Sequence, residues 1–271
     1  MRWPEAAALA VAVMVLAGGC SRLTFVKPSA ERRGMERVAP EYSFKETPES
    51  RARAEARRQV AIADRHLRAG ELAQAESAAR EALEADASIA EPHTMLALVA
   101  TRQGQAELAG RHYAEAARLG PSGATYNNYG AWLCSNGRAQ DSLSWFDNAL
   151  RDARYGDRAG ALANAGSCAA RAGQYDRVER DLRAALELDP ANAVALEAMA
   201  SFAFGQRRYL EARAFSERRL AAAPATPATL ELASRIEEQL GDTVAATRYV
   251  QRLRTEFPQA RNAIPGDSTQ P

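Results

Sequence analysis

Hydrophobic and polar positions divide the chain into three stretches. An uninterrupted apolar run extends from Ala6 to Ala17, and residues 21–50 carry prolines and mixed charges without a clean period. From about residue 51 onward, small, apolar and turn residues return at intervals of about 34 residues. The last stretch therefore predicts a repeated helical unit, and the first two predict a targeting segment and a linker.

The repeated units carry the same marks at the same places. A turn glycine recurs at Gly70, Gly104, Gly137, Gly173 and Gly241. Small residues follow at fixed offsets at Ala75, Ala82, Ala109, Ala116, Ser142, Ala149, Ala185 and Ala246. Glycine accepts the left-handed backbone of a tight turn, and small residues let two helix axes approach closely. This period and these marks are typical of the tetratricopeptide repeat (TPR).

We therefore expect residues 51–260 to form an all-α TPR solenoid, six helix-turn-helix repeats in a right-handed superhelix. A single hairpin cannot bury its apolar face alone, so the repeats must stack. The predicted repeats are 56–89, 90–123, 123–156, 159–192, 193–226 and 227–260. Residues 155–157 form an insertion, and Arg207 stands where the fifth repeat should have its turn glycine. The alternative is an unrelated helical bundle with chance spacing. Residues 261–271 are expected to be a disordered tail.

The apolar run at the N-terminus is too short for a membrane-spanning helix, which needs about 20 residues. It predicts a signal peptide over residues 1–19. The run ends in two glycines and Cys20, which resembles the lipobox of bacterial lipoproteins, so residues 20–50 would be a lipidated, flexible tether. The alternative is an ordinary signal peptide with an incidental cysteine. By the same resemblance, Ser21 in place of aspartate implies sorting to the outer membrane, with the domain facing the periplasm.

Composition and motifs favour a binding protein over an enzyme. The net charge of +1 creates no field that would attract nucleic acid or acidic lipid. Three cysteines and three histidines lack the spacing of a metal site, and no nucleophile elbow or phosphate loop is present. We therefore expect no cofactor, no metal and no catalytic residue.

The first helix of each TPR unit lines an inner groove, where a partner would bind as an extended peptide or a helix. The predicted partner-binding residues are Arg102, Asn127, Asn128, Ala131, Arg171 and Glu197. The alternative is that many of them are merely solvated. Adjacent asparagines within a helix are costly in propensity. One of the pair could bridge to the neighbouring helix, and one could clamp the backbone of a bound segment.

Two further cysteines, Cys134 and Cys168, fall on the first helices of consecutive units. These helices pack side by side, and the two positions could face each other at the Cα separation of about 4.4–6.8 Å that a disulfide needs. An oxidising compartment such as the periplasm would favour the bond. We predict a Cys134–Cys168 disulfide; the alternative is two small buried thiols.

A family resemblance rests on the string NNYGAWLC at residues 127–134, set in a six-repeat domain behind a lipobox. This combination resembles the PilF/PilW family of type IV pilus pilotins over the whole mature domain. The resemblance implies an outer-membrane lipoprotein that supports assembly or localisation of the pilus secretin, or stability of the pilus fibre. Its partners would be the secretin or other pilus-assembly proteins. The alternative is a periplasmic TPR scaffold lipoprotein of another envelope complex, such as outer-membrane assembly or cell-wall machinery.

Overall fold

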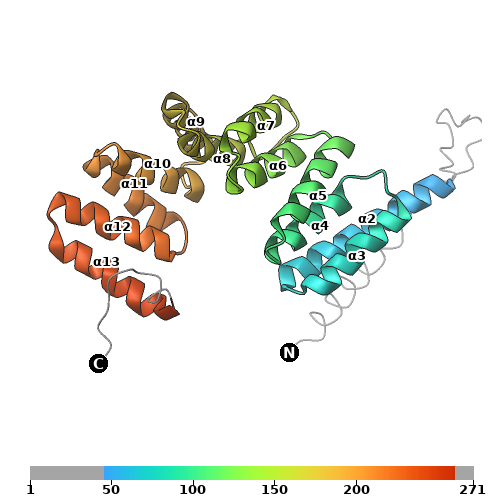
Figure 1. Cartoon of the computed structure of the whole chain (residues 1–271), viewed down its shortest axis with the longest axis horizontal. Helices are drawn as coiled ribbons and strands as arrows, with labels where there is room; N and C mark the ends of the chain where they lie inside the picture. Colours follow the sequence, from blue (N-terminus) through green and yellow to red (C-terminus); the bar gives the residue numbers. More distant parts are fainter. Residues whose placement is uncertain (1–45, 260–271) are drawn as a thin grey trace, which may run out of the picture. The chain divides into compact units, whose positions relative to one another are not determined.

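The computed structural model describes residues 46–259, which fold into twelve α-helices and no strand (Figure 1). The predictions for the signal peptide at 1–19, the lipidated Cys20 and the tail at 261–271 lie outside these residues. All twelve helices belong to one compact unit of the protein. The expected all-α repeat architecture is therefore confirmed.

Consecutive helices pair into six hairpins, which follow one another in the order of the predicted repeats. The pairs are α2 (Pro48–Ala69) with α3 (Leu72–Ala85), α4 (Glu91–Arg102) with α5 (Ala106–Leu119), α6 (Gly123–Ser135) with α7 (Ala139–Arg151), α8 (Arg158–Arg171) with α9 (Tyr175–Leu188), α10 (Ala193–Gly205) with α11 (Tyr209–Ala222), and α12 (Pro227–Leu240) with α13 (Thr243–Glu256). In repeats three and four, the first helices α6 and α8 lie along one side and the second helices α7 and α9 lie along the other (Figure 1).

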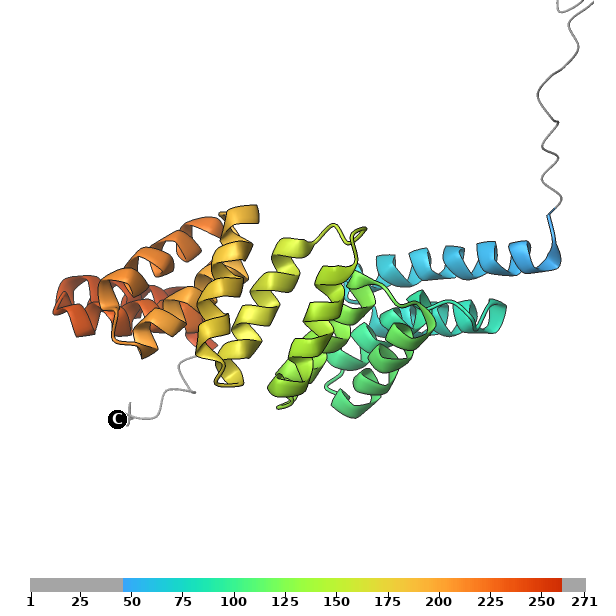
Figure 2. The same cartoon turned by 90° about the horizontal axis from the view of Figure 1, so that it is seen from above.

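The first helix begins earlier than the sequence predicts. We expected the tether to continue to residue 50, but α2 begins at Pro48 and extends past the end of α3 (Figure 2). Thr47 caps this helix, because its hydroxyl accepts the Ser50 N–H while the Ser50 hydroxyl accepts the Thr47 N–H. Proline suits the first helical position, where its missing N–H has no helical partner. Pro48 therefore starts a helix rather than marking a linker.

The turns inside the hairpins have the left-handed backbone that the glycine spacing predicts. Each of the five turn glycines has φ between 72° and 82°. In the fifth repeat Arg207 takes this place with φ of 59°, the one non-glycine residue with positive φ among those described. The register therefore holds in this repeat although its glycine is missing.

Small residues bring the two helices of a hairpin into close contact. The recurring small residues after the turn are all buried, and each is at most 5% exposed. At Gly130 of α6 an added Cβ would lie 3.0 Å from the Phe146 ring of α7, so the ring packs directly on the helix backbone. Gly166 of α8 receives Leu182 of α9 in the same way, and Leu182 is fully buried. Burying a leucine in this way stabilises the fold by about 2 kcal/mol.

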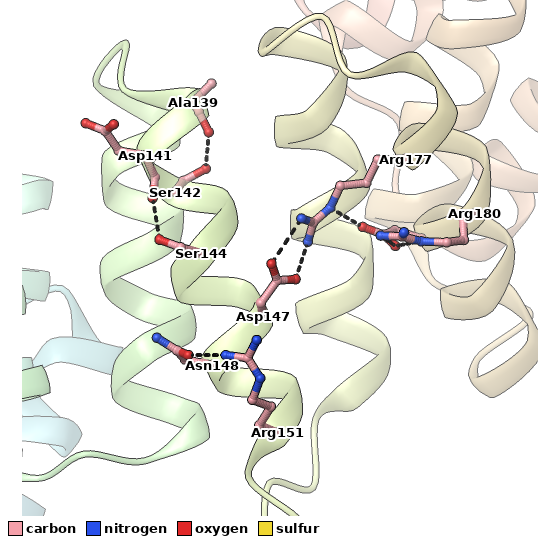
Figure 3. Close-up of polar contacts among 10 residues, drawn as sticks. Ala139, Asp141, Ser142, Ser144, Asp147, Asn148, Arg151, Arg177 and Arg180 are labelled. Atoms are coloured by element: carbon pink, nitrogen blue, oxygen red, sulfur yellow. Dashed lines mark hydrogen bonds and ion pairs between the residues drawn. The ribbon is translucent and has the colours of Figure 1, made fainter.

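A partly buried ion network joins the second helices of repeats three and four (Figure 3). Arg177 of α9 donates to Asp147 of α7 at 2.6 Å and to Asp181 at 2.8 Å, and Arg180 donates to the other oxygen of Asp181. Only 5% of the Asp181 side chain is exposed. Burial alone would lower the pKa of Arg177, but the bonds to both carboxylates outweigh burial and raise it. Arg177 therefore stays charged, and its bonds hold α9 against α7.

Candidate partner-binding surface

Two adjoining hollows lie along the first helices of repeats one to three, and the second of them also reaches α5. The N-terminal hollow, of about 620 Å³, is lined by residues of α2, α4 and α6, including Val60, Thr94 and Asn128. The central hollow, of about 520 Å³, is lined mainly by α6, which contributes Asn128, Ala131 and Trp132, and it is completed by residues of α4, α5 and the turn between them. Asn128 belongs to both hollows, so they meet at this residue. The first helices thus provide the concave sites that the TPR pattern predicts.

The two adjacent asparagines have different surroundings, and one of them forms the bridge that the sequence left open. The Asn127 side-chain oxygen accepts a hydrogen bond at 3.0 Å from the amide of Asn164 on α8, so this residue bridges α6 to the next repeat. Asn128 lines the hollows, and no side-chain hydrogen bond to it occurs within residues 46–259. An amide left in this way can bind the backbone of a partner segment.

The C-terminal hollow lies between α8 and α10 and measures about 600 Å³. Its residues are Ser167, Ala170, Arg171, Tyr175, Val194, Glu197, Ala198, Ser201, Phe202, Gly205 and Gln206. The structure thus brings the predicted Arg171 and Glu197 together. Sequence reasoning missed Tyr175, Val194 and Phe202, which give the hollow apolar walls.

Arg102 has an intramolecular role that the sequence did not reveal. Its guanidinium donates to the carbonyl oxygen of Leu67, which lies in the last turn of α2. The Leu67 carbonyl also accepts the Gly70 N–H at 3.2 Å, so the arginine from the next repeat adds a second hydrogen bond at this helix end. Arg102 therefore ties repeat two to repeat one, and it lines none of the three hollows.

A disulfide joins the first helices of repeats three and four. Cys134 of α6 and Cys168 of α8 have bonded sulfurs and Cα atoms 5.8 Å apart, and both residues are 5% exposed. Together with the Asn127–Asn164 bond, the bridge holds α6 against α8. The disulfide thereby fixes α6, which lines the central hollow, against α8, which lines the C-terminal hollow.

Within residues 46–259 no group of three or more histidine, cysteine or acidic residues could hold a metal ion. His93 of α4 and His112 of α5 pack on each other with their Nδ1 atoms 3.0 Å apart. Burial lowers the pKa of both imidazoles. No helix in the same residues combines the length and apolarity of a membrane span.

No protein-family model matches the chain. Among curated proteins, it is 27% identical over 195 residues to the type IV pilus assembly protein PilF of Pseudomonas aeruginosa, a match that covers 71% of this chain and 77% of PilF. Among solved structures, it resembles PilW, described as a widely conserved type IV pilus biogenesis factor. That match has a TM-score of 0.69 and 25% identity, and it covers 75% of this chain and 94% of PilW.

The chain is similar to PilF and PilW, and these comparisons support a place among TPR proteins of that kind. A solved structure of Pseudomonas aeruginosa PilF adds a further likeness in fold, with a TM-score of 0.67, 23% identity and coverage of 79% of this chain and 95% of that one. The family resemblance predicted from the string at residues 127–134 is therefore confirmed. In this protein, four of the six predicted partner-binding residues line hollows: Asn128, Ala131, Arg171 and Glu197.

Proposed function

We propose that this protein is an outer-membrane lipoprotein adaptor, a pilotin, that supports type IV pilus biogenesis by helping the pilus secretin to assemble or localise. The observation that carries the proposal is its likeness to PilF and PilW, whose names place them in type IV pilus assembly and biogenesis. A TPR fold alone hosts many functions, so the fold by itself would not select this one.

The hollows on the first helices support a role in protein binding. Peptides bind TPR-like surfaces through backbone contacts and a few side-chain pockets, and these hollows offer polar groups beside apolar walls. The adaptor would hold a secretin subunit there while acyl groups on Cys20 anchor the pair to the outer membrane. The secretin's location would then depend on the adaptor's lipid, since each buried CH₂ contributes about 0.8 kcal/mol to membrane binding.

The decisive experiment removes the lipid and keeps the domain. Cells lacking the gene would receive the wild-type protein, Cys20→Ala, or Ser21→Asp, which should retain a lipidated protein in the inner membrane. Secretin multimers are then measured in outer-membrane fractions, with circular dichroism to check that the purified variants fold. We expect both variants to fold and to lose most multimers from the outer membrane. Normal multimers with Cys20→Ala would refute the proposal.

Co-purification tests the alternative of another envelope scaffold. A tagged wild-type protein should enrich the secretin or other pilus-assembly proteins. Enrichment of barrel-assembly or cell-wall enzymes without any pilus protein would favour the alternative.

A further inference from the structure

The C-terminal hollow combines exposed apolar side chains with polar groups that have no partner among residues 46–259. Tyr175 is 56% exposed and Val194 is 49% exposed, while the Tyr175 ring lies 5.9 Å from that of Phe202, centre to centre. Exposed apolar side chains gathered in one concave site are typical of surfaces that bind another molecule. The same Tyr175 and Phe202 also border an adjoining depression, where Arg208 is already paired with Glu179.

The charge of the hollow is positive once its internal ion pair is counted. Glu197 faces Arg219, whose guanidinium donates to it at 3.1 Å and is itself only 8% exposed. That pair neutralises the acidic residue of the hollow. Arg171 makes no ion pair and no side-chain hydrogen bond with any residue in the range 46–259. One guanidinium is therefore left to interact with an occupant.

Arg171 differs in this respect from its counterparts in other repeats. Arg68, Arg102 and Arg171 each stand two residues before a turn glycine. Arg68 pairs with Asp64 at 2.9 Å, and Arg102 donates to the Leu67 carbonyl. Among these three arginines, only Arg171 forms no ion pair or side-chain hydrogen bond with the described residues. Its place in the TPR repeat therefore does not by itself explain why its guanidinium is unpaired.

Two hydroxyl groups add hydrogen-bonding capacity at matching positions. Ser167 and Ser201 stand one repeat apart, and both line the hollow. Hydroxyls within helices often bond to the carbonyl one turn back, as Thr101 does to Ala97 at 2.8 Å. Neither serine hydroxyl does so, and neither bonds to another group within the described residues. They are therefore available to a bound backbone.

We propose that the C-terminal hollow binds a peptide segment in which a carboxylate stands beside an apolar or aromatic side chain. Arg171 takes the carboxylate through two parallel N–H···O bonds, a geometry that guanidinium and carboxylate groups share. The apolar side chain lies against Val194 and Phe202. The carboxylate belongs either to an aspartate or glutamate or to the C-terminus of a polypeptide. The inference rests on the proposed function only for the identity of the protein that supplies the segment.

The test uses two synthetic pools of randomised decapeptides, one with a free C-terminal carboxylate and one amidated. Each pool is passed over the immobilised full-length protein in detergent, and retained peptides are sequenced by mass spectrometry. Acidic residues beside large apolar ones in the retained amidated peptides indicate a side-chain carboxylate. Retention from the free pool alone indicates a C-terminus. Either result supports the proposal, and retention without preference for a carboxylate overturns it, as does the absence of retention.

Variants locate the binding to this hollow. Arg171→Gln should raise the dissociation constant of a retained peptide about tenfold or more, because a charged pair of hydrogen bonds is lost. The matched control is Arg254→Gln, an exposed arginine on α13 that should leave binding unchanged. Equal binding by wild type and Arg171→Gln would overturn the proposal. Peptide binding that depends on Arg171, combined with normal secretin multimers in the Cys20→Ala strain, would refute the proposed function alone.

Discussion

The fifth-repeat turn offers a sharp test of how the repeats are built, because Arg207 occupies a backbone position that the other five repeats assign to glycine. The Arg207 N–H donates to Phe204 O and the Arg208 N–H to Ala203 O, both at 2.9 Å. At Gly173 the corresponding bonds measure 3.2 and 2.9 Å. The hydrogen bonding is thus the same, and the side chain at φ of 59° is the difference. We predict that Arg207→Gly stabilises the protein.

The magnitude follows from two opposing effects. A left-handed backbone costs an L-residue about 1–2 kcal/mol, which glycine avoids. Glycine gains freedom in the unfolded state, which offsets about 0.4–1 kcal/mol of that gain. Arg207 is exposed and makes no ion pair within residues 46–259, so its removal sacrifices no contact there. The expected net stabilisation is about 0.5–1 kcal/mol, or about 1–4 °C in Tm for a domain of this size.

The assay is thermal and urea unfolding followed by far-ultraviolet circular dichroism under non-reducing conditions. Because repeat proteins can unfold in segments, hydrogen exchange at the Arg208 amide should also slow. The control is Gln206→Gly, where φ is −83°, so glycine relieves no strain and should destabilise by about 0.5–1 kcal/mol. A variant at Arg207 that is no more stable than wild type would show that this turn carries no left-handed strain.

Three further predictions concern the contacts that hold the repeats together. Arg177→Met should destabilise the protein by about 2–4 kcal/mol in urea titration, because the buried carboxylate of Asp181 loses a partner. The control Arg80→Met breaks the exposed pair with Glu76 and should cost at most about 0.5 kcal/mol. Cys134→Ser should lower the free energy of unfolding by about 3–4 kcal/mol, since the disulfide closes a loop with a sequence separation of 34. Free thiols at both cysteines in mass spectra of the non-reduced wild type would contradict this account. Burial lowers the pKa of His93 and His112 below 6.5, so the folded state binds fewer protons than the unfolded state between the lowered pKa and 6.5. The free energy of unfolding should therefore fall as pH drops through that window. The decrease in Tm between about pH 7.5 and 5.5 should be larger for wild type than for His112→Gln.

The sequence predicts the hairpins well because their signals are local. A glycine at each turn and small residues at fixed offsets report backbone conformation and helix approach directly, and even the exception at Arg207 keeps the register. The start of α2 was missed because its cap is a Thr47–Ser50 pair rather than the commoner threonine with glutamate. Pro48, taken as a linker residue, fits the first helical turn equally well.

The candidate surface was predicted less fully, because side-chain engagement depends on neighbouring repeats. The spacing places Arg102 and Arg171 at equivalent positions, yet only the structure shows that Arg102 reaches the Leu67 carbonyl. Likewise Asn127 and Asn128 are adjacent in sequence, and packing against α8 alone separates a bridging residue from one that lines a hollow. In the sequence, Tyr175 belongs to the turn pattern of the fourth repeat, and this pattern does not indicate that its side chain is exposed in the C-terminal hollow.

The central claim is that the first helices hold a pilus-assembly partner, and site-specific photo-cross-linking in living cells tests it most directly. A cross-linking residue would replace Asn128 or Ser201, which line hollows on the first helices, or Ser144, an exposed control position on α7. The account predicts that the first two positions, and not the control, form an adduct with the secretin or another pilus-assembly protein. Adducts confined to the control, or to proteins of another envelope complex, would contradict it.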